Sequence, residues 1–275
     1  MVREIETDAK TFADPRRTLI QAEKKAVVEV RVVDEPVTVV VSEKGWVRSR
    51  LGHEVDVETL AFKAGDALYA TFACRSVDTL LAFGSQGRVY SVPVASLPGG
   101  RGDGQPITSM IELEAGTQVL HYFAGAASLN LLLSSSGGYG FLATVGNLVS
   151  RQRAGKAFIT CNAGESVCAP SVADGATHVA CASTGGRILT FEITELKSMA
   201  TGGRGLMLLA LEDKDSLAGA AAYSRSVRID GIGRGGKLRS ETLEIRSLNN
   251  ARAARARKGK AADLGFKPQS IWRME

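Results

Sequence analysis

Ten arginines and lysines recur along the chain in loops rich in glycine and alanine. Of all the residues in the sequence, they indicate a chemical role most clearly. Their side chains hold positive charge, and glycine lets a main-chain N–H approach an oxyanion closely. Cations repeated in this way can neutralise successive phosphates of a nucleic acid and release condensed counterions. The predicted phosphate-binding residues are Arg101, Arg151, Arg153, Lys156, Arg204, Arg252, Arg255, Arg257, Lys258 and Lys260.

The character of these loops indicates which nucleic acid they fit. No aromatic residue interleaves them, whereas binding of single strands uses aromatic side chains for base stacking. No recognition-helix signature is present either, so we expect binding to the backbone of duplex DNA with weak sequence preference and with bending. The alternative for any one Gly-Arg-Gly turn is a solvated loop, and for residues 252–260 a solvated helix face or tail. Repetition of the loops favours binding.

Other kinds of site have little support. Cys161, Cys168, His178 and Cys181 could be grouped as zinc ligands, but their spacing matches no zinc motif, and buried free cysteine behaves as a small hydrophobe. Residues 231–236 match GxGxxG without the strand-then-helix context of a dinucleotide site, so we interpret them as a basic loop. With no GxxxxGK[ST] loop and no hydrolytic constellation, we predict no metal, cofactor or catalytic residue in this chain.

The elements that must position the loops are repeated β-hairpins. Four segments each contain an apolar run, a small polar turn ending in glycine, and a second apolar or aromatic run. A leucine follows three of these glycines by ten residues, and an Ala-Gly turn recurs in three units. The glycines that end the turns, the key glycines, are Gly45, Gly87, Gly138 and Gly186; the leucines are Leu97, Leu148 and Leu196; the Ala-Gly turns are 64–66, 115–117 and 163–165.

A weaker fifth unit follows, with Gly236 as its key glycine and residues 219–224 as the preceding apolar run. Terminal repeats are often atypical because they have one neighbour. A period near 50 residues with about four strands per unit predicts blades around a centre. We therefore predict an all-β, propeller-like fold of about five four-stranded blades over residues 35–275. Residues 1–34 are predicted to be a tail from a preceding domain, with a short helix capped by Asp14.

Composition agrees with a globular β-protein that has an anionic partner. The 275 residues include 30 glycines and only 7 prolines, which fits many tight turns. The net charge is +5 and the pI about 9.1, so the distribution of charge matters more than its sum. Because there is no run of 18 apolar residues and no apolar segment of a secretory signal near the N-terminus, we expect a cytoplasmic protein without a membrane partner.

Several stretches resemble one protein family. Residues 35–50, together with 52–56 and 63–66, look like the first blade in the A subunit of topoisomerase IV. Residues 151–160 resemble its third blade, and residues 8–17 are similar to the chain leaving its coiled-coil region. The resemblance covers nearly the whole sequence, and its first-blade motif is more specific than any single basic loop.

This resemblance implies a fold and a function. In that family the C-terminal domain is a broken β-pinwheel that binds and bends the transported DNA segment and helps select topology in relaxation, decatenation and chromosome segregation. The implied partners are duplex DNA, the remainder of the A subunit and the ATPase B subunit, in a nucleoid-associated enzyme. ATP and Mg²⁺ would be used by other domains of that type IIA topoisomerase.

Two further sequence features, compared with related enzymes, favour topoisomerase IV over gyrase and place the catalytic residues outside this chain. The A subunit of gyrase carries a Gln-Arg-Arg-Gly-Gly-Lys-Gly box in its first blade, which residues 50–64 lack and residues 152–157 echo only in part. The family's cleavage tyrosine follows an arginine, and none of the five tyrosines here does, so no catalytic activity is expected in this chain. The alternative function is a β-propeller scaffold that binds proteins. It is disfavoured because no WD or kelch signature is present and because such a scaffold has no general need for cations at equivalent loops.

Overall fold

The computed structural model describes residues 2–13, 33–99 and 102–274. The chain divides into two compact units, Met1–Arg31 and Val32–Glu275. In the first unit, α1 (Val2–Thr11) has no buried residue. The helix predicted to start at Asp14 lies outside the described residues. None of the described helices is long and apolar enough to cross a membrane.

Short antiparallel strands make up most of the second unit, as the hairpin pattern predicts. They are β1 (Pro36–Ser42), β2 (Trp46–Leu51), β3 (Leu68–Arg75), β4 (Thr79–Gly84), β5 (Arg88–Pro93), β6 (Gln105–Pro106), β7 (Val119–Gly125), β8 (Asn130–Ser134), β9 (Tyr139–Thr144), β10 (Lys156–Ala157), β11 (Ser171–Val172), β12 (His178–Ser183), β13 (Arg187–Glu192), β14 (Leu206–Met207), β15 (Leu217–Tyr223), β16 (Ser226–Gly233), β17 (Leu238–Glu244), β18 (Lys260–Ala261) and β19 (Phe266–Met274). Two single-turn helices, α2 (Val145–Leu148) and α3 (Ile245–Leu248), lie between strands.

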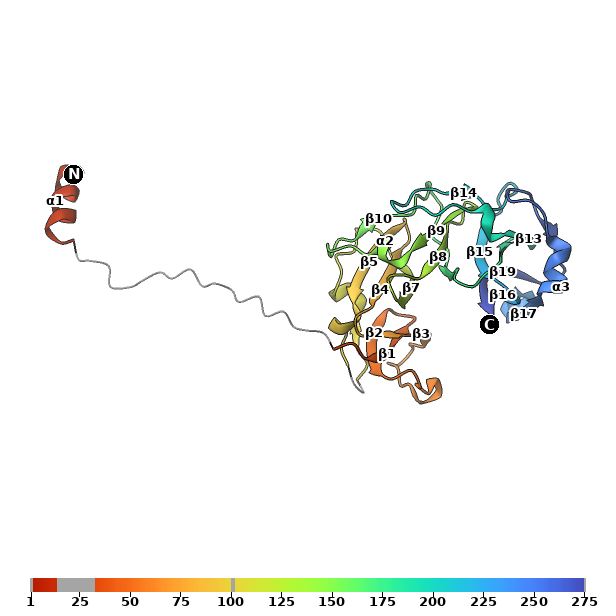
Figure 1. The fold of residues 1–275 in the computed structure, drawn as a ribbon. Coiled ribbons are helices and arrows are strands. Elements are labelled where there is room, and N and C mark those ends of the chain that lie inside the picture. The colour runs from red at the N-terminus through yellow and green to blue at the C-terminus, as the bar shows by residue number, and fades with distance from the viewer. Residues whose placement is uncertain (1, 14–32, 100–101, 275) are drawn as a thin grey trace. The chain divides into compact units, whose positions relative to one another are not determined.

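The strands form five sheets, or blades, that follow one another in chain order from orange to blue (Figure 1). Four blades have four strands, in the orders β3-β1-β2-β6, β10-β5-β4-β7, β11-β8-β9-β14 and β15-β12-β13-β18. The fifth blade has three, in the order β17-β16-β19. The prediction of an all-β fold with about five blades is confirmed, and the described residues give the fifth blade no fourth strand.

Each complete blade is assembled in the same way. Its two central strands form a hairpin whose turn ends at a key glycine, and the next strand of the unit pairs with the first hairpin strand. The two-residue fourth strand comes from farther along the chain, after the hairpin of the next blade, and pairs with the second hairpin strand. All five key glycines have left-handed φ values between +77° and +90°, which glycine adopts at little cost.

One strand assignment predicted from the sequence was wrong. Residues 219–224 do not open the fifth hairpin; they belong mainly to β15, the third strand of the fourth blade. The fifth hairpin is β16 and β17. β19 packs against one face of β15, where a Cβ on Gly219 would lie 3.1 Å from Cγ2 of Ile271.

The hydrophobic core consists of four layers, each between two successive blades. Alternation along the strands divides side chains between layers, because successive residues of a strand point to opposite faces. In β4, Leu80 and Ala82 pack toward the first blade, whereas Leu81 and Phe83 pack toward the third. Among the described residues no such layer joins the fifth blade to the first, so the described pinwheel is open at that point.

The second unit contains a cavity lined in part by strands of several blades. Strands β3, β7, β11 and β19 contribute to the lining of a central cavity of about 650 Å³. Arg273 of β19 donates hydrogen bonds to the carbonyl oxygens of Val172, at 3.2 Å, and Asp174, at 2.7 Å.

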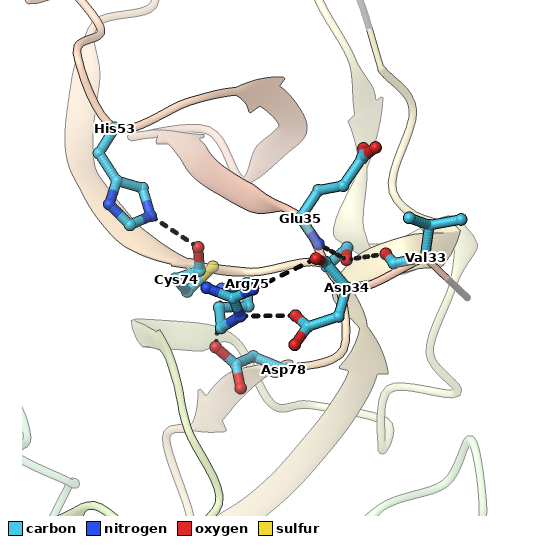
Figure 2. Close-up of polar contacts among 8 residues, drawn as sticks. Val33, Asp34, Glu35, His53, Cys74, Arg75 and Asp78 are labelled. Carbon is cyan, nitrogen blue, oxygen red and sulfur yellow. Dashed lines mark hydrogen bonds and ion pairs between the residues drawn. The ribbon is translucent and has the colours of Figure 1, made fainter. Parts of the chain in front are cut away.

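The start of the second unit is fixed to the end of β3 (Figure 2). Arg75 Nε donates to Asp34 Oδ1 at 2.6 Å, and the Ser76 hydroxyl links Glu35 N to the Val33 carbonyl.

Candidate nucleic-acid interface

The predicted basic loops occupy equivalent places in the fold. They are the crossing loops, defined as the segments that immediately precede β6, β10, β14 and β18 and carry the chain to the edge of the preceding blade. The hypothesis that these loops share a position in the repeat is therefore supported by the strand order. Arg101 of the first crossing loop lies outside the described residues.

Each crossing loop contains at least one glycine that the fold requires. The φ values of Gly104, Gly155, Gly205 and Gly259 are +90°, +61°, +79° and +70°. A Cβ on these glycines would lie 2.3, 2.4, 2.3 and 2.6 Å from a main-chain oxygen of the neighbouring hairpin strand. Real Cβ atoms do not approach oxygen so closely. The close crossing of two backbones thus accounts for these glycines, independently of any contact with phosphate.

Arginines of the hairpins hold three crossing loops in place. Arg48 donates to the carbonyl of Gly102 at 2.5 Å, Arg88 to that of Ala154 at 3.0 Å, and Arg187 to that of Gly259 at 3.2 Å. Burial lowers the pKa of Arg48, whose side chain also donates to the Ala61 carbonyl. Sequence reasoning missed these residues, although Arg88 and Arg187 each directly follow a key glycine.

Three of the predicted cations are free for an external anion. Arg151, Arg257 and Lys260 are exposed, and their side chains form no hydrogen bond or ion pair within the described part of the chain. Arg151 lies in the crossing loop that reaches the second blade, and the other two lie in or beside the loop that reaches the fourth. These residues fit the predicted role best.

Three others are tied to main-chain carbonyls. Arg153 donates to Met110 O at 3.0 Å and to Ser109 O at 2.7 Å. Lys156 Nζ donates to the Asn147 carbonyl at 2.5 Å, near the end of α2. Arg255 donates to the Met207 carbonyl at 2.5 Å and is partly buried. These bonds tie the side chains to the main chain of other segments, so the side chains have a structural role that the sequence did not indicate.

The remaining three contact acidic side chains. Arg252 pairs with Glu192 at 2.5 Å, Lys258 lies 3.8 Å from Glu212, and Arg204 lies 3.7 Å from Glu165. Exposed pairs of this kind contribute little to stability. They do lower the charge that these cations offer to a phosphate.

No aromatic residue lies within the basic loops, but the fold brings one beside Arg204. Its guanidinium lies 3.9 Å from the centre of the Tyr139 ring. Pairing of β14 with β9 brings Tyr139 there from the preceding hairpin. In the first blade Lys63 lies 3.4 Å from the centre of the Trp46 ring. Both aromatics directly follow key glycines, and that spacing was the signal that could have revealed them.

Further exposed cations that were not among the predicted site residues gather on the fourth and fifth blades. Their side chains carry no hydrogen bond or ion pair in the ranges that the structure describes. They include Lys197, Arg234, Lys237, Arg239, Arg246 and Lys267. The GxGxxG stretch supplies part of this set, since residues 231–236 run from β16 through a turn toward β17. A strand–turn–strand context agrees with our interpretation of that stretch as a basic loop.

The cysteines fit the interpretation as packed thiols. Cys74, Cys168 and Cys181 are buried and free, and Cys161 is partly exposed. Burial raises the pKa of Cys74 to about 11 and that of Cys168 to about 12. Within the described ranges no three His, Cys, Asp or Glu side chains are grouped so that they could hold a metal ion.

Comparison with known proteins agrees with this geometry. A family model described as the DNA gyrase C-terminal domain, beta-propeller, matches residues 78–113 and 177–224. The chain is 38% identical over 273 residues to the A subunit of DNA topoisomerase 4 from Neisseria gonorrhoeae, a match that covers 94% of this chain and 34% of the relative. It is 36% identical over 221 residues to the Escherichia coli K12 protein of the same name, covering 79% of this chain and 29% of that one. The chain thus spans about a third of the length of these curated relatives.

A solved structure extends the match to the fold. The E. coli ParC C-terminal domain superposes with a TM-score of 0.74 at 31% identity, covering 86% of this chain and 98% of that chain. Fold, repeats and crossing loops define a β-pinwheel of the class found at the C-termini of type IIA topoisomerase A subunits. Within that class, the chain belongs to the family of C-terminal domains from topoisomerase IV A subunits.

Proposed function

We propose that this chain binds duplex DNA without sequence preference along its crossing loops and bends it, as the DNA-presenting domain of a topoisomerase IV. The observation that carries the proposal is the set of three exposed, unpaired cations, Arg151, Arg257 and Lys260, at crossing loops of two different blades. Such cations release counterions when they meet phosphates. The additional unpaired cations of the fourth and fifth blades would extend the contact along the DNA.

The wider role follows from the relatives. As part of a topoisomerase IV, the domain would hold the transported segment and help choose between relaxation and decatenation. The rest of the A subunit and the ATPase B subunit would be its partners on cytoplasmic, nucleoid-associated DNA. ATP and Mg²⁺ would serve those other parts, and this chain would bind DNA without cleaving it.

The test is a salt titration of affinity for a random-sequence 40-base-pair duplex. We expect a slope of log K against log salt of about −4 or steeper. Neutralising Arg151, Arg257 or Lys260 with Gln is expected to flatten the slope by about 0.9 each, and the triple variant by about 2.7. Arg75→Gln removes the same charge from a residue already paired with Asp34, so it serves as the matched control with an unchanged slope.

Two outcomes would count against the proposal. If the chain does not bind the duplex even at low salt, the exposed cations are merely solvated surface residues, and the protein-scaffold function gains support. If the three Gln variants keep the wild-type slope, DNA follows another surface. Bending is measured separately, as energy transfer between dyes at the two ends of the duplex, and unchanged transfer on binding would remove bending from the proposal.

A further inference from the structure

The residue that directly follows the key glycine alternates in type from the first blade to the fourth. In the second and fourth blades it is an arginine, Arg88 or Arg187, and the fold uses its N–H groups. Each arginine donates to a carbonyl of its crossing loop and pairs with a glutamate, at 3.2 and 2.9 Å. In the first and third blades the same position is aromatic, with Trp46 and Tyr139.

Each of these two rings carries a cation from another segment. The Lys63 ammonium lies 3.4 Å from the centre of the Trp46 ring, and the Arg204 guanidinium lies 3.9 Å from the centre of the Tyr139 ring. The two ring residues are equivalent in the repeat, because each pairs with the second residue of the fourth strand of its blade. Positive charge therefore lies at this place in all four complete blades, held by a ring in two of them.

The cations on the rings keep N–H groups that an anion could use. Lys63 and Arg204 are exposed, and Lys63 has no hydrogen bond or ion pair in the ranges that the structure describes. Arg204 lies 3.7 Å from a carboxylate oxygen of Glu165, which is longer than an ordinary hydrogen bond. A ring face attracts a cation through its π electrons and supplies no oxygen acceptor, so the N–H groups remain available to a phosphate.

We propose that Trp46 and Tyr139 are positioning residues that hold Lys63 and Arg204 for phosphates of duplex DNA. A long side chain loses rotamer freedom when it binds, and a ring that already confines the side chain reduces this cost. The inference rests on the proposed DNA binding and deepens it. The three free cations that carry that proposal lie at crossing loops of the second and fourth blades, and these two pairs would add the first and third blades to the contact.

The test measures affinity of the 275-residue chain for the same 40-base-pair duplex by fluorescence anisotropy over a range of salt concentrations. Lys63→Gln and Arg204→Gln are each expected to flatten the slope of log K against log salt by about 0.9. Trp46→Leu and Tyr139→Leu keep the charge and lose its confinement. They should weaken binding about two- to tenfold at one salt concentration and leave the slope unchanged.

Conservative and double variants separate positioning from a merely structural role. Trp46→Phe and Tyr139→Phe keep a ring, so their affinity should stay within about twofold of the wild type. Once the cation of a pair is glutamine, replacing its ring with leucine should cause no further loss of affinity. Trp272→Leu is the matched control, because Trp272 is partly exposed and has no cation over its ring in the described part of the chain. Circular dichroism verifies the fold of each variant.

Three results would overturn the inference. They are glutamine variants that keep the wild-type slope, leucine variants that keep the wild-type affinity, and a loss caused by leucine that is as large when the cation of the pair is already glutamine. The last result would show that the ring acts on the fold and not through its cation. If the wild-type chain does not bind the duplex at low salt, both proposals fall. If Arg151→Gln flattens the slope while Lys63→Gln and Arg204→Gln do not, this inference alone falls.

Discussion

Replacing Gly155 with alanine is expected to destabilise the protein through two separable effects. The residue has φ of +61°, a conformation that costs a residue with a Cβ about 1–2 kcal/mol. The new Cβ would also lie 2.4 Å from the Val89 carbonyl oxygen, so the crossing loop must shift. The shift would weaken the pairing of Lys156 with Val89 and the bonds from Arg88, each worth about 0.5–1.5 kcal/mol. Together these effects predict a loss of about 3 kcal/mol.

Two further glycines separate the contributions. Gly116 has φ of +75° but open space around a built Cβ, so Gly116→Ala should lose only about 1–2 kcal/mol. Gly99 has neither a left-handed φ nor a neighbour within 4 Å, so Gly99→Ala should change stability by less than about 0.5 kcal/mol. The measurement is equilibrium urea denaturation of the three variants, monitored by circular dichroism. The curves are fitted with one shared m-value, the dependence of the unfolding free energy on urea concentration.

The order of the three losses in unfolding free energy shows whether the close crossing of backbones and the left-handed φ each contribute. If Gly155→Ala and Gly116→Ala lose the same free energy, the close crossing of backbones contributes nothing, and our explanation for the glycines of the crossing loops is wrong. If Gly99→Ala is as destabilising as Gly116→Ala, the cost does not come from the left-handed backbone.

Other predictions rest on burial and on titration. Leu132→Ala empties a fully buried site between the third and fourth blades and should cost about 2–5 kcal/mol in denaturation, whereas the exposed Leu51→Ala should cost less than about 0.5 kcal/mol. Burial lowers the pKa of His121 from 6.5 to about 4, so as the pH falls the unfolded chain takes up a proton at this residue before the folded protein does. The free energy of unfolding should therefore fall by up to about 3 kcal/mol from pH 6.5 to 4. A His121→Gln variant whose stability depends on pH as steeply as the wild type over this range would refute this. Burial alone would raise the pKa of Asp215, but hydrogen bonds from Thr184 and Gly185, among others, hold it below 3.8. The stability they provide is present above pH 3.8 and lost as the pH falls through the lowered pKa, and Asp215→Asn should flatten that acid limb.

The repeated hairpins could be predicted because their signals are local. A key glycine needs a left-handed φ within one turn, and strand alternation places successive side chains on opposite faces, whatever the rest of the chain does. The Ala-Gly turns were recognisable for the same reason, since Gly65, Gly116 and Gly164 have φ of +72°, +75° and +83°. These features sufficed to predict the number of blades and the equivalence of the crossing loops.

The assignment of single strands and cations required the tertiary structure. Residues 219–224 look like a hairpin strand, but they belong mainly to β15, which pairs with β12 as the third strand of the fourth blade. Arg255 looks like a free cation, but its partner is a carbonyl 48 residues earlier in the chain. Arg151 and Arg153 are two residues apart in one loop, and only the second meets carbonyls of the preceding unit.

The amino-acid sequence by itself therefore determined the class of fold, its repeats and the loops that carry positive charge. The tertiary structure decided which cations remain without a partner in the described part of the chain, and which glycines exist for the crossing of two backbones. The physical reason is that turns and strands depend on neighbours within a few residues. Hydrogen bonds and burial, in contrast, join segments that only the pairing of blades brings together.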